Sequence, residues 1–345
     1  ALAADDVETL TLTTSATDAH IDFEATEVMT TADALTTITV TAGGDDSSDI
    51  LVAQIGDTAA AAALTTLTVT AADGADVDFE ELIDAEGATM SSVTLTASTT
   101  GSVITLAGLG ADGANITSIN TITASAVTGA TVDIENIEAT TIGTISVSGA
   151  GTFRADGADM DITTLERIDA SGASGSVTFD ATSTVGAVDV TLGTGSATYY
   201  TSLGNDVITL ASGDGTDQIV VNDSAAGPGS ISIYNFQNAG GGDAVDLSLT
   251  GIGGLDLDGS NANTLVDVDG SGADATGAII LLETSGVIDF DDTDADANVL
   301  VLDSDIADST ALLTALAASG THEVTLGAAL TNDDAFLVLW DNGTD

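Results

Sequence analysis

The chain has 345 residues, with 55 acidic residues against two basic ones, which gives a formal net charge of −53 at pH 7. Nucleic acid and anionic membrane surfaces are therefore excluded as partners, because binding to either needs a cationic surface. Hydrophobic residues make up 43% of the chain, which is too many for a disordered acidic tail. The absence of cysteine excludes a disulfide framework and thiolate metal sites. No run of about 18 apolar residues occurs, so we expect no membrane-spanning helix.

Residues 1–190 carry an internal repeat in which threonine or serine alternates with aliphatic residues. Alternation of this kind places one row of side chains inward and a threonine row outward. A fixed period marks a solenoid, whose coils bury their aliphatic faces only against their neighbours. We therefore predict an all-β fold, a right-handed parallel β-solenoid. Five copies begin at near-equal intervals, at Val7, Leu35, Leu64, Met90 and Ile119.

Further short segments lie within or after these repeats. Two weaker copies begin at Ile134 and Leu165, and residues 162–168 are predicted as strand rather than helix. The acidic piece 78–85 is predicted as a helical turn or a short 3₁₀ segment. Second β-like runs, which would supply two or three short strands in each coil, cover residues 50–53, 103–106, 144–148 and 177–180.

A leucine-rich repeat is the alternative to a β-solenoid, because Leu-x-x-Leu-x-Leu at 20–29 residues fits that class too. The asparagine expected after the last apolar position of that pattern is absent. No helical period follows each strand either. The β-solenoid is therefore the favoured interpretation.

Residues 191–222 alternate glycine- or aspartate-rich turns with short β-branched runs. The turns are predicted to need glycine for positive φ, and aspartates with turn carbonyls supply the hard oxygen ligands that calcium prefers. Two units, around 204–208 and 213–219, resemble the glycine/aspartate nonapeptide of a calcium-binding parallel β-roll, although neither is complete. The candidate calcium ligands and turn residues in this segment are Gly204, Asp206, Gly213, Asp214, Gly215 and Asp217.

Residues 223–345 are acidic and β-rich. A strand over 230–236 ends in Tyr-Asn-Phe, and the segment 242–248 reads Gly-Asp-Ala-Val-Asp-Leu-Ser, which adds Asp243 and Asp246 as candidate calcium ligands. One helix is predicted from Asp308 or Ser309 to Ala318, with an N-cap at its start and Gly320 as its stop. Further strands are predicted over 265–269, 278–282, 298–302 and 335–340.

The nonapeptide-like units, followed by Tyr234-Asn235-Phe236 and the segment 242–248, resemble bacterial RTX-type proteins exported by type I secretion. The threonine-rich repeats before them look like the body of surface-layer proteins and large secreted adhesins of that class. Two departures stand out, since Ser202-Leu203 replaces the family's Gly-Gly and the unit at Gly193 lacks the aspartate. The resemblance implies an extracellular, cell-surface protein that folds outside the cell on meeting millimolar calcium.

Three functions follow as expectations. The first is a secreted, calcium-stabilised structural protein that self-assembles into a surface layer or filament. The second is an adhesin or biofilm-matrix module that binds a surface or a cell-surface glycan, and the third is the non-catalytic part of a secreted RTX hydrolase. We expect no enzyme activity, because His20 and His322 are the only histidines and paired carboxylates cannot be told from the acidic background. The expected divisions are 1–190, 191–222 and 223–345.

Overall fold

The protein is a stack of parallel β-strands, followed by a second unit with the single helix among the described residues. A computed structural model describes residues 2–3, 6–22, 29–45, 48–52, 55–59, 61–110, 116–156, 159–211, 215–221, 231–235, 244–246, 281–284, 288–289, 299–306, 309–317, 320, 324–325 and 337–341. The chain divides into two compact units, Ala1–Asp246 and Leu247–Asp345. The predicted all-β solenoid class is confirmed.

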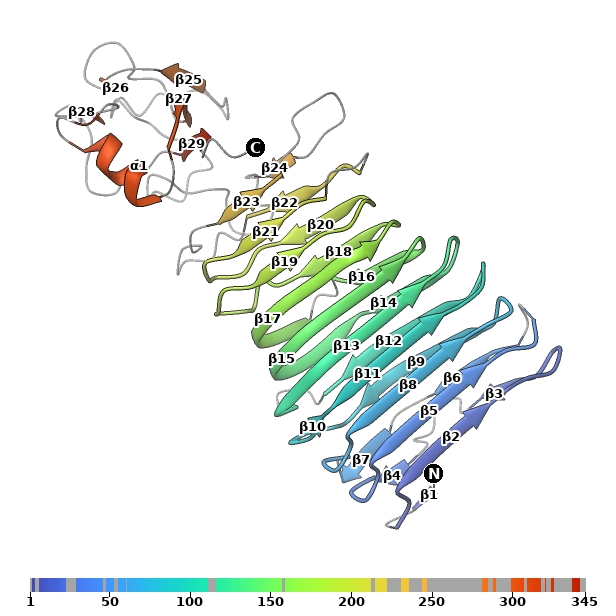
Figure 1. Ribbon diagram of the computed structural model, residues 1–345. Coiled ribbons are helices and arrows are strands. Elements are labelled where there is room, and N and C mark those ends of the chain that lie inside the picture. Colours follow the sequence, from blue (N-terminus) through green and yellow to red (C-terminus); the bar gives the residue numbers. More distant parts are fainter. Residues whose placement is uncertain are drawn as a thin grey trace, which may run out of the picture. The chain divides into compact units, whose positions relative to one another are not determined.

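The first ladder of parallel strands contains the threonine repeats (Figure 1). Thr9 pairs with Thr37, Thr37 with Thr66, Thr66 with Ser92, and Val93 with Ile122. Each strand is thus displaced from the next by one sequence repeat, as the spacing of the copies predicts. The ladder runs through β2 (Thr9–Thr13), β5 (Thr37–Ala42), β8 (Thr66–Ala71), β11 (Ser92–Ala97), β13 (Ser118–Ala126), β15 (Asn136–Gly149), β17 (Asp159–Ala173), β19 (Asp189–Thr191), β21 (Val207–Thr209) and β23 (Ser232–Tyr234).

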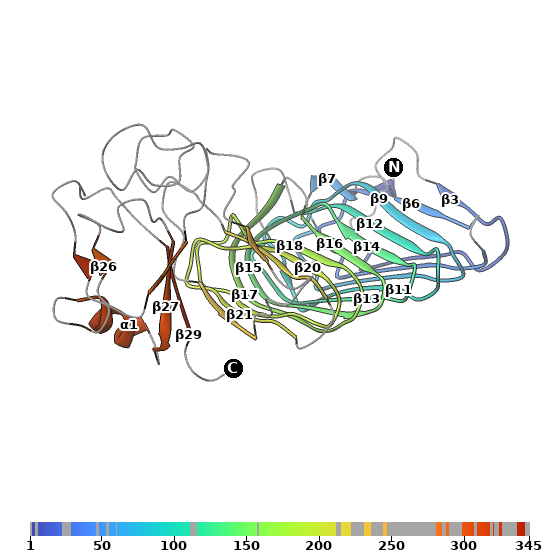
Figure 2. The same cartoon turned by 90° about the horizontal axis from the view of Figure 1, so that it is seen from above.

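A second ladder runs beside the first, and Figure 2 shows several of its strands following one another along the array. Each pair is parallel, as in the steps Ile104↔Val132 and Phe179↔Tyr199. The strands are β3 (Ile21–Asp22), β6 (Ile50–Val52), β9 (Asp76–Ile83), β12 (Val103–Leu109), β14 (Thr131–Ile134), β16 (Thr152–Ala155), β18 (Val177–Asp180), β20 (Ala197–Tyr200), β22 (Gln218–Val220) and β24 (Ala244–Asp246).

A third ladder is present only in the earlier coils. It starts with β1 (Leu2–Ala3), β4 (Met29–Thr31) and β7 (Ile55–Ala59) and continues through parts of β9, β12, β15 and β17. A short strand, β10 (Thr89–Met90), adds to β13. Beyond β17 the described strands of the first unit belong to the first two ladders, so the coils become smaller. The step from Val190 to its partner Ile208 is accordingly much shorter in sequence than the step from Ile104 to Val132.

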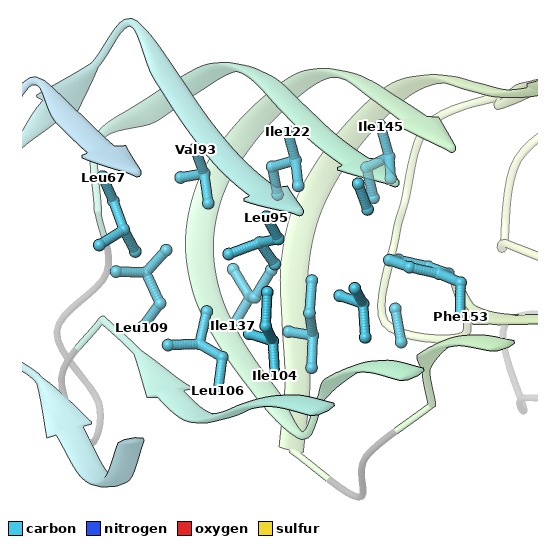
Figure 3. Packing of buried hydrophobic residues seen from close by; sticks show 14 of the residues in the cluster. Leu67, Val93, Leu95, Ile104, Leu106, Leu109, Ile122, Ile137, Ile145 and Phe153 are labelled. Carbon is cyan, nitrogen blue, oxygen red and sulfur yellow. The ribbon is translucent and has the colours of Figure 1, made fainter. Parts of the chain in front are cut away.

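The core is a set of aliphatic rows that run along the stack (Figure 3). Leu67, Val93, Ile122 and Ile145 occupy equivalent positions in successive coils and are almost fully buried. Burying one such side chain contributes about 1.5–3 kcal/mol, so each coil is stabilised mainly by its neighbours. Phe153 and Phe179 extend the core toward the smaller coils, with ring centroids 5.2 Å apart.

Two sequence predictions about the strands of this unit were wrong. Residues 78–83 belong to β9 rather than to a helical turn, because Val77 and Phe79 alternate into the core and the strand pairs with β6 and β12. The weak copy at Ile134 lies in a different ladder from the other copies, since Ile137 pairs with Leu109 and Met160.

The segment 144–148, which was predicted as a second run, takes the place of a threonine repeat in the first ladder, because Ile145 pairs with Ile122 and Ile168. Each repeat is built from strands wherever it is described, which disfavours the leucine-rich alternative.

The second unit is described at fewer positions. β25 (Leu281–Thr284), β27 (Val299–Asp305) and β29 (Leu337–Asp341) form a parallel sheet, and β26 (Ile288–Asp289) pairs with β28 (Val324–Thr325). The predicted helix is confirmed as α1 (Ser309–Leu316), and the amide of Gly320 donates to the carbonyl of Ala317 just after it (2.8 Å). The strand predicted over 265–269 lies outside the described residues. Among the described residues, no helix is long and apolar enough to cross a membrane.

Candidate calcium site at the narrow end of the solenoid

The predicted calcium segment lies within the smaller coils, where β19 to β22 continue both ladders without a break at residue 190. Gly204 and Gly215 sit in turns between these strands, and neither has the positive φ that the sequence predicts. Glycine is needed there for a different reason. A methyl group at Gly204 would overlap the backbone of Gly186, and one at Gly215 would overlap the carbonyl of Gly195. The glycines therefore let successive turns stack closely.

Asp206 is a buried carboxylate, with 1% of its surface exposed. Its Oδ1 accepts hydrogen bonds from the amide of Val188 (2.9 Å) and from the Ser202 hydroxyl. Its Oδ2 accepts from the Ser202 amide (2.8 Å) and from the Tyr199 hydroxyl (3.0 Å). Four donors match the roughly four lone-pair positions of an ionised carboxylate. We call Asp206, Ser202 and Tyr199 the aspartate clip. The clip joins two coils, because Asp206 accepts the amide of Val188 from the preceding coil.

Tyr199 is the other buried polar group of the clip, and its side chain is fully enclosed. Burial raises the pKa of the Tyr199 hydroxyl well above 10.0, and the negative charge of Asp206 raises it further. The hydroxyl is therefore held as a hydrogen-bond donor. The Ser202 oxygen also lies 2.9 Å from the carbonyl of Gly186, so its single proton is shared between that carbonyl and Asp206, which ties the clip to the preceding turn.

Asp217 occupies a similar position one turn later and is 3% exposed. Its Oδ1 accepts the amide of Ala197, 2.9 Å away in the preceding coil. Asp206 and Asp217 thus each reach back about one coil, by 18 and 20 residues, to a backbone amide at or just before the start of a strand. Asp206 and Asp217 therefore have a structural role of the same kind.

The other predicted ligands are described less fully. Gly213, Asp214 and Asp243 lie outside the described residues. Asp246 ends β24, where it pairs with Val220. The nearby Asn235 has a positive φ of 62°, and its side-chain amide donates to the carbonyl of Leu210 (3.0 Å). The asparagine of the Tyr-Asn-Phe motif therefore ends a strand and joins two coils.

The aspartate clip does not fit a calcium ion as it stands, because hydrogen-bond donors already point at both oxygens of Asp206. Calcium takes six to eight oxygen ligands. Among the described residues, no group of three or more histidine, cysteine, aspartate or glutamate side chains is arranged to hold a metal. Calcium binding through the remaining candidates stays a prediction.

Sequence reasoning missed Ser202 and Tyr199 as partners of Asp206. In the sequence, Ser202 stands out only because the RTX pattern has Gly-Gly at Ser202-Leu203. In the fold, the Ser202 hydroxyl contacts Asp206 and accepts the amide of Gly204, so it holds this turn together. A polar side chain four residues before a turn aspartate is the signal that could have found it.

The solenoid surface carries acids that no cation in the chain neutralises. Arg154 bonds to Asp156 through two contacts of 3.2 Å, and Arg167 contacts Asp169 at 3.4 Å. Burial raises the pKa of Asp133, and Glu135 and Asp156 raise it further, although Arg154 opposes the shift. Burial is thus the main cause of the raised pKa of Asp133, and the two neighbouring carboxylates add to it.

Comparison with known proteins gave no relatives. No protein-family model matches the chain, and no curated protein or solved structure matches it.

Proposed function

We propose that the chain is a secreted structural protein that self-assembles at the cell surface into a calcium-stabilised layer or filament. The proposal rests on one observation above all. The first unit of the chain is a stack of coils, the whole chain has a net charge of −53, and both of its arginines are already paired with aspartates two residues away. Such a surface repels copies of itself unless cations neutralise it.

Calcium is the cation we propose, for two reasons. Carboxylates are its preferred ligands, and extracellular modules bind it at roughly 10⁻⁴–10⁻³ M. A surface carboxylate of one chain fills only part of the six to eight ligand positions of calcium, so a second copy could supply further oxygen ligands. Calcium would then bridge the acidic sides of neighbouring solenoids. Because the ion binds the assembled state better than the free chain, it drives assembly by mass action.

The test is a calcium titration of the purified chain, followed by negative-stain microscopy and light scattering. We expect ordered sheets or fibres at millimolar calcium that dissolve when EGTA is added. Sodium chloride at equal ionic strength is the control, since it screens charge without bridging carboxylates.

Other outcomes separate the alternatives. Arrays that resist EGTA would remove calcium bridging from the proposal. A monomer at every calcium concentration would contradict self-assembly and favour the adhesin or biofilm-matrix module. Hydrolysis of polysaccharide or peptide would favour part of a secreted RTX hydrolase.

A further inference from the structure

One side of the solenoid is a grid of hydroxyl side chains. In six successive strands of the first ladder, the outward positions form three rows, and all 18 positions are threonine or serine. All are accessible to solvent. The rows are Thr9, Thr37, Thr66, Ser92, Thr121, Thr144; Thr11, Thr39, Thr68, Thr94, Thr123, Ser146; and Thr13, Thr41, Thr70, Thr96, Ser125, Ser148. We call this surface the threonine face.

The threonine face carries no charge, which is unusual for a chain with 55 acidic residues. Threonine's β-propensity explains its presence in strands, but it does not explain the absence of acids. The neighbouring second ladder does have them at outward positions, in the register row of Asp78, Thr105, Asp133 and Arg154. The face ends where β17 places Arg167 and Asp169 in the same rows. Charge is thus sorted between the sides of one solenoid.

The hydroxyls of the central row are free to bind a ligand. Among the described residues, the side chains of Thr68, Thr94 and Thr123 make no hydrogen bond to protein. Hydroxyls just outside the face behave differently. Those of Thr65 and Ser91 donate to carbonyls in the preceding coil at 3.0 and 2.8 Å. Within the face, the Thr66 hydroxyl contacts that of Ser91 at 3.5 Å, so the hydroxyls that hold the coils together lie at the edge of the grid.

The grid is regular in both directions. The strand pairs that build it show no register shift from β2 to β15. Neighbouring hydroxyls therefore repeat about every 4.8 Å along the stack and about every 6.6 Å along a strand. Oxygen positions on the surface of hexagonal ice repeat at distances of the same size. Each threonine also presents a methyl group, which orders the water around it.

Other occupants match this surface less well. The face contains no aromatic side chain on which the rings of a neutral polysaccharide could stack. Its grid covers about 24 Å by about 13 Å, which is well below the roughly 800 Å² that each partner buries in a stable protein complex. An ionic ligand would find no opposite charge.

We propose that the threonine face binds the surface of ice. The ordered hydroxyl and methyl groups hold a layer of water in positions that continue the ice lattice. A charged side chain would orient water around itself instead and break that layer. Ice binding needs no calcium bridge and no second copy. The test of this proposal is therefore independent of the test of self-assembly.

Thermal hysteresis and inhibition of ice recrystallisation test the proposal on the full chain. We expect both activities in the wild type. Thr94→Tyr, at the centre of the grid, should lose most of the hysteresis because the ring lifts the face from a flat surface. Thr105→Tyr makes the same change in the second ladder and should keep it. Thermal melts establish that both variants remain folded.

Charge gives a second, independent pair of variants. Thr94→Glu should abolish the hysteresis, whereas Thr105→Glu, placed among residues that already include Asp78 and Asp133, should leave it unchanged. Absence of hysteresis in the folded wild type would overturn the proposal. Equal loss on both sides of the solenoid would overturn it too, as would binding to cellulose with no effect on ice.

Discussion

The solenoid has a wide part, β1 to β17, and a narrow part, β18 to β24. In both parts an aspartate side chain joins two coils, but the two aspartates differ in how far they are buried. In the wide part, Asp76 accepts the amide of Val103 (3.0 Å) and remains half-buried. In the narrow part, Asp206 is enclosed and accepts four hydrogen bonds. When an exposed carboxylate is removed, water can replace it as the hydrogen-bond acceptor. When a buried carboxylate is removed, its donors stay unsatisfied, which costs more stability.

This difference follows from coil size. The wide coils close three ladders around rows of isoleucine, leucine and valine, so their stability comes from apolar burial. Where the structure describes them, the narrow coils have two ladders and fewer buried aliphatic positions. Closely stacked glycines and buried polar contacts replace part of the lost core, and we therefore expect the narrow end to be the part most sensitive to single polar substitutions.

Replacing Asp206 by alanine is the strongest way to break this comparison. The change should destabilise the narrow coils by about 3–5 kcal/mol, because at least two buried donors, each costing about 1–3 kcal/mol, would lose their acceptor. Native-state hydrogen exchange measures this locally, since the amides of Val188 and Ser202 donate to Asp206. Their protection should fall while that of the β8 and β11 amides stays.

Asp189→Ala is the matched control, because Asp189 is exposed on the adjacent β19. Its effect should stay within about 0.5 kcal/mol. Equal effects of the two substitutions would mean that the aspartate clip contributes nothing to the stability of the narrow coils.

The repeat could be predicted from sequence because alternate burial fixes strand register. The steps between Thr9, Thr37, Thr66 and Ser92 can be counted directly along the chain. Alternation does not say which ladder a strand joins, so the copy at Ile134 was misplaced once the coils shortened. The acidic residues in Asp78-Phe-Glu-Glu led to the prediction of a helical turn, although the inward-facing residues of this segment are apolar and form a strand. Burial of Asp206 could not be predicted, since its donors come from three separate positions that only the fold brings together.

Tyr199→Phe tests the clip through pH. Below pH 10 the substitution should cost about 1–2 kcal/mol, because Asp206 loses one buried donor. The folded pKa of Tyr199 lies well above its unfolded value of 10.0. The stability linked to this group is therefore present below pH 10 and is lost as the pH rises further, since only the unfolded chain ionises.

Urea titrations between pH 8 and pH 11 measure the difference. The wild type should lose its advantage over Tyr199→Phe across the alkaline range. Parallel curves for the two proteins would show that the hydroxyl is not held in its neutral form by the fold. Tyr200→Phe, on the same strand and partly accessible, supplies the control.

Asp76→Asn gives the smallest expected effect and the opposite sign. Burial raises the pKa of Asp76 above 3.8, and Asp49 raises it further, although the hydrogen bond from Val103 opposes the shift. A carboxylate with a raised pKa favours folding below its unfolded pKa and loses that contribution as the pH rises through the folded value. Asparagine keeps an acceptor for Val103 without the charge. Thermal melts in EDTA should therefore show a gain of about 0.5 kcal/mol or less at pH 7 and none at pH 3. A loss of stability at pH 7 would contradict this prediction. It would mean that the fold requires the charge of Asp76, as it requires that of Asp206.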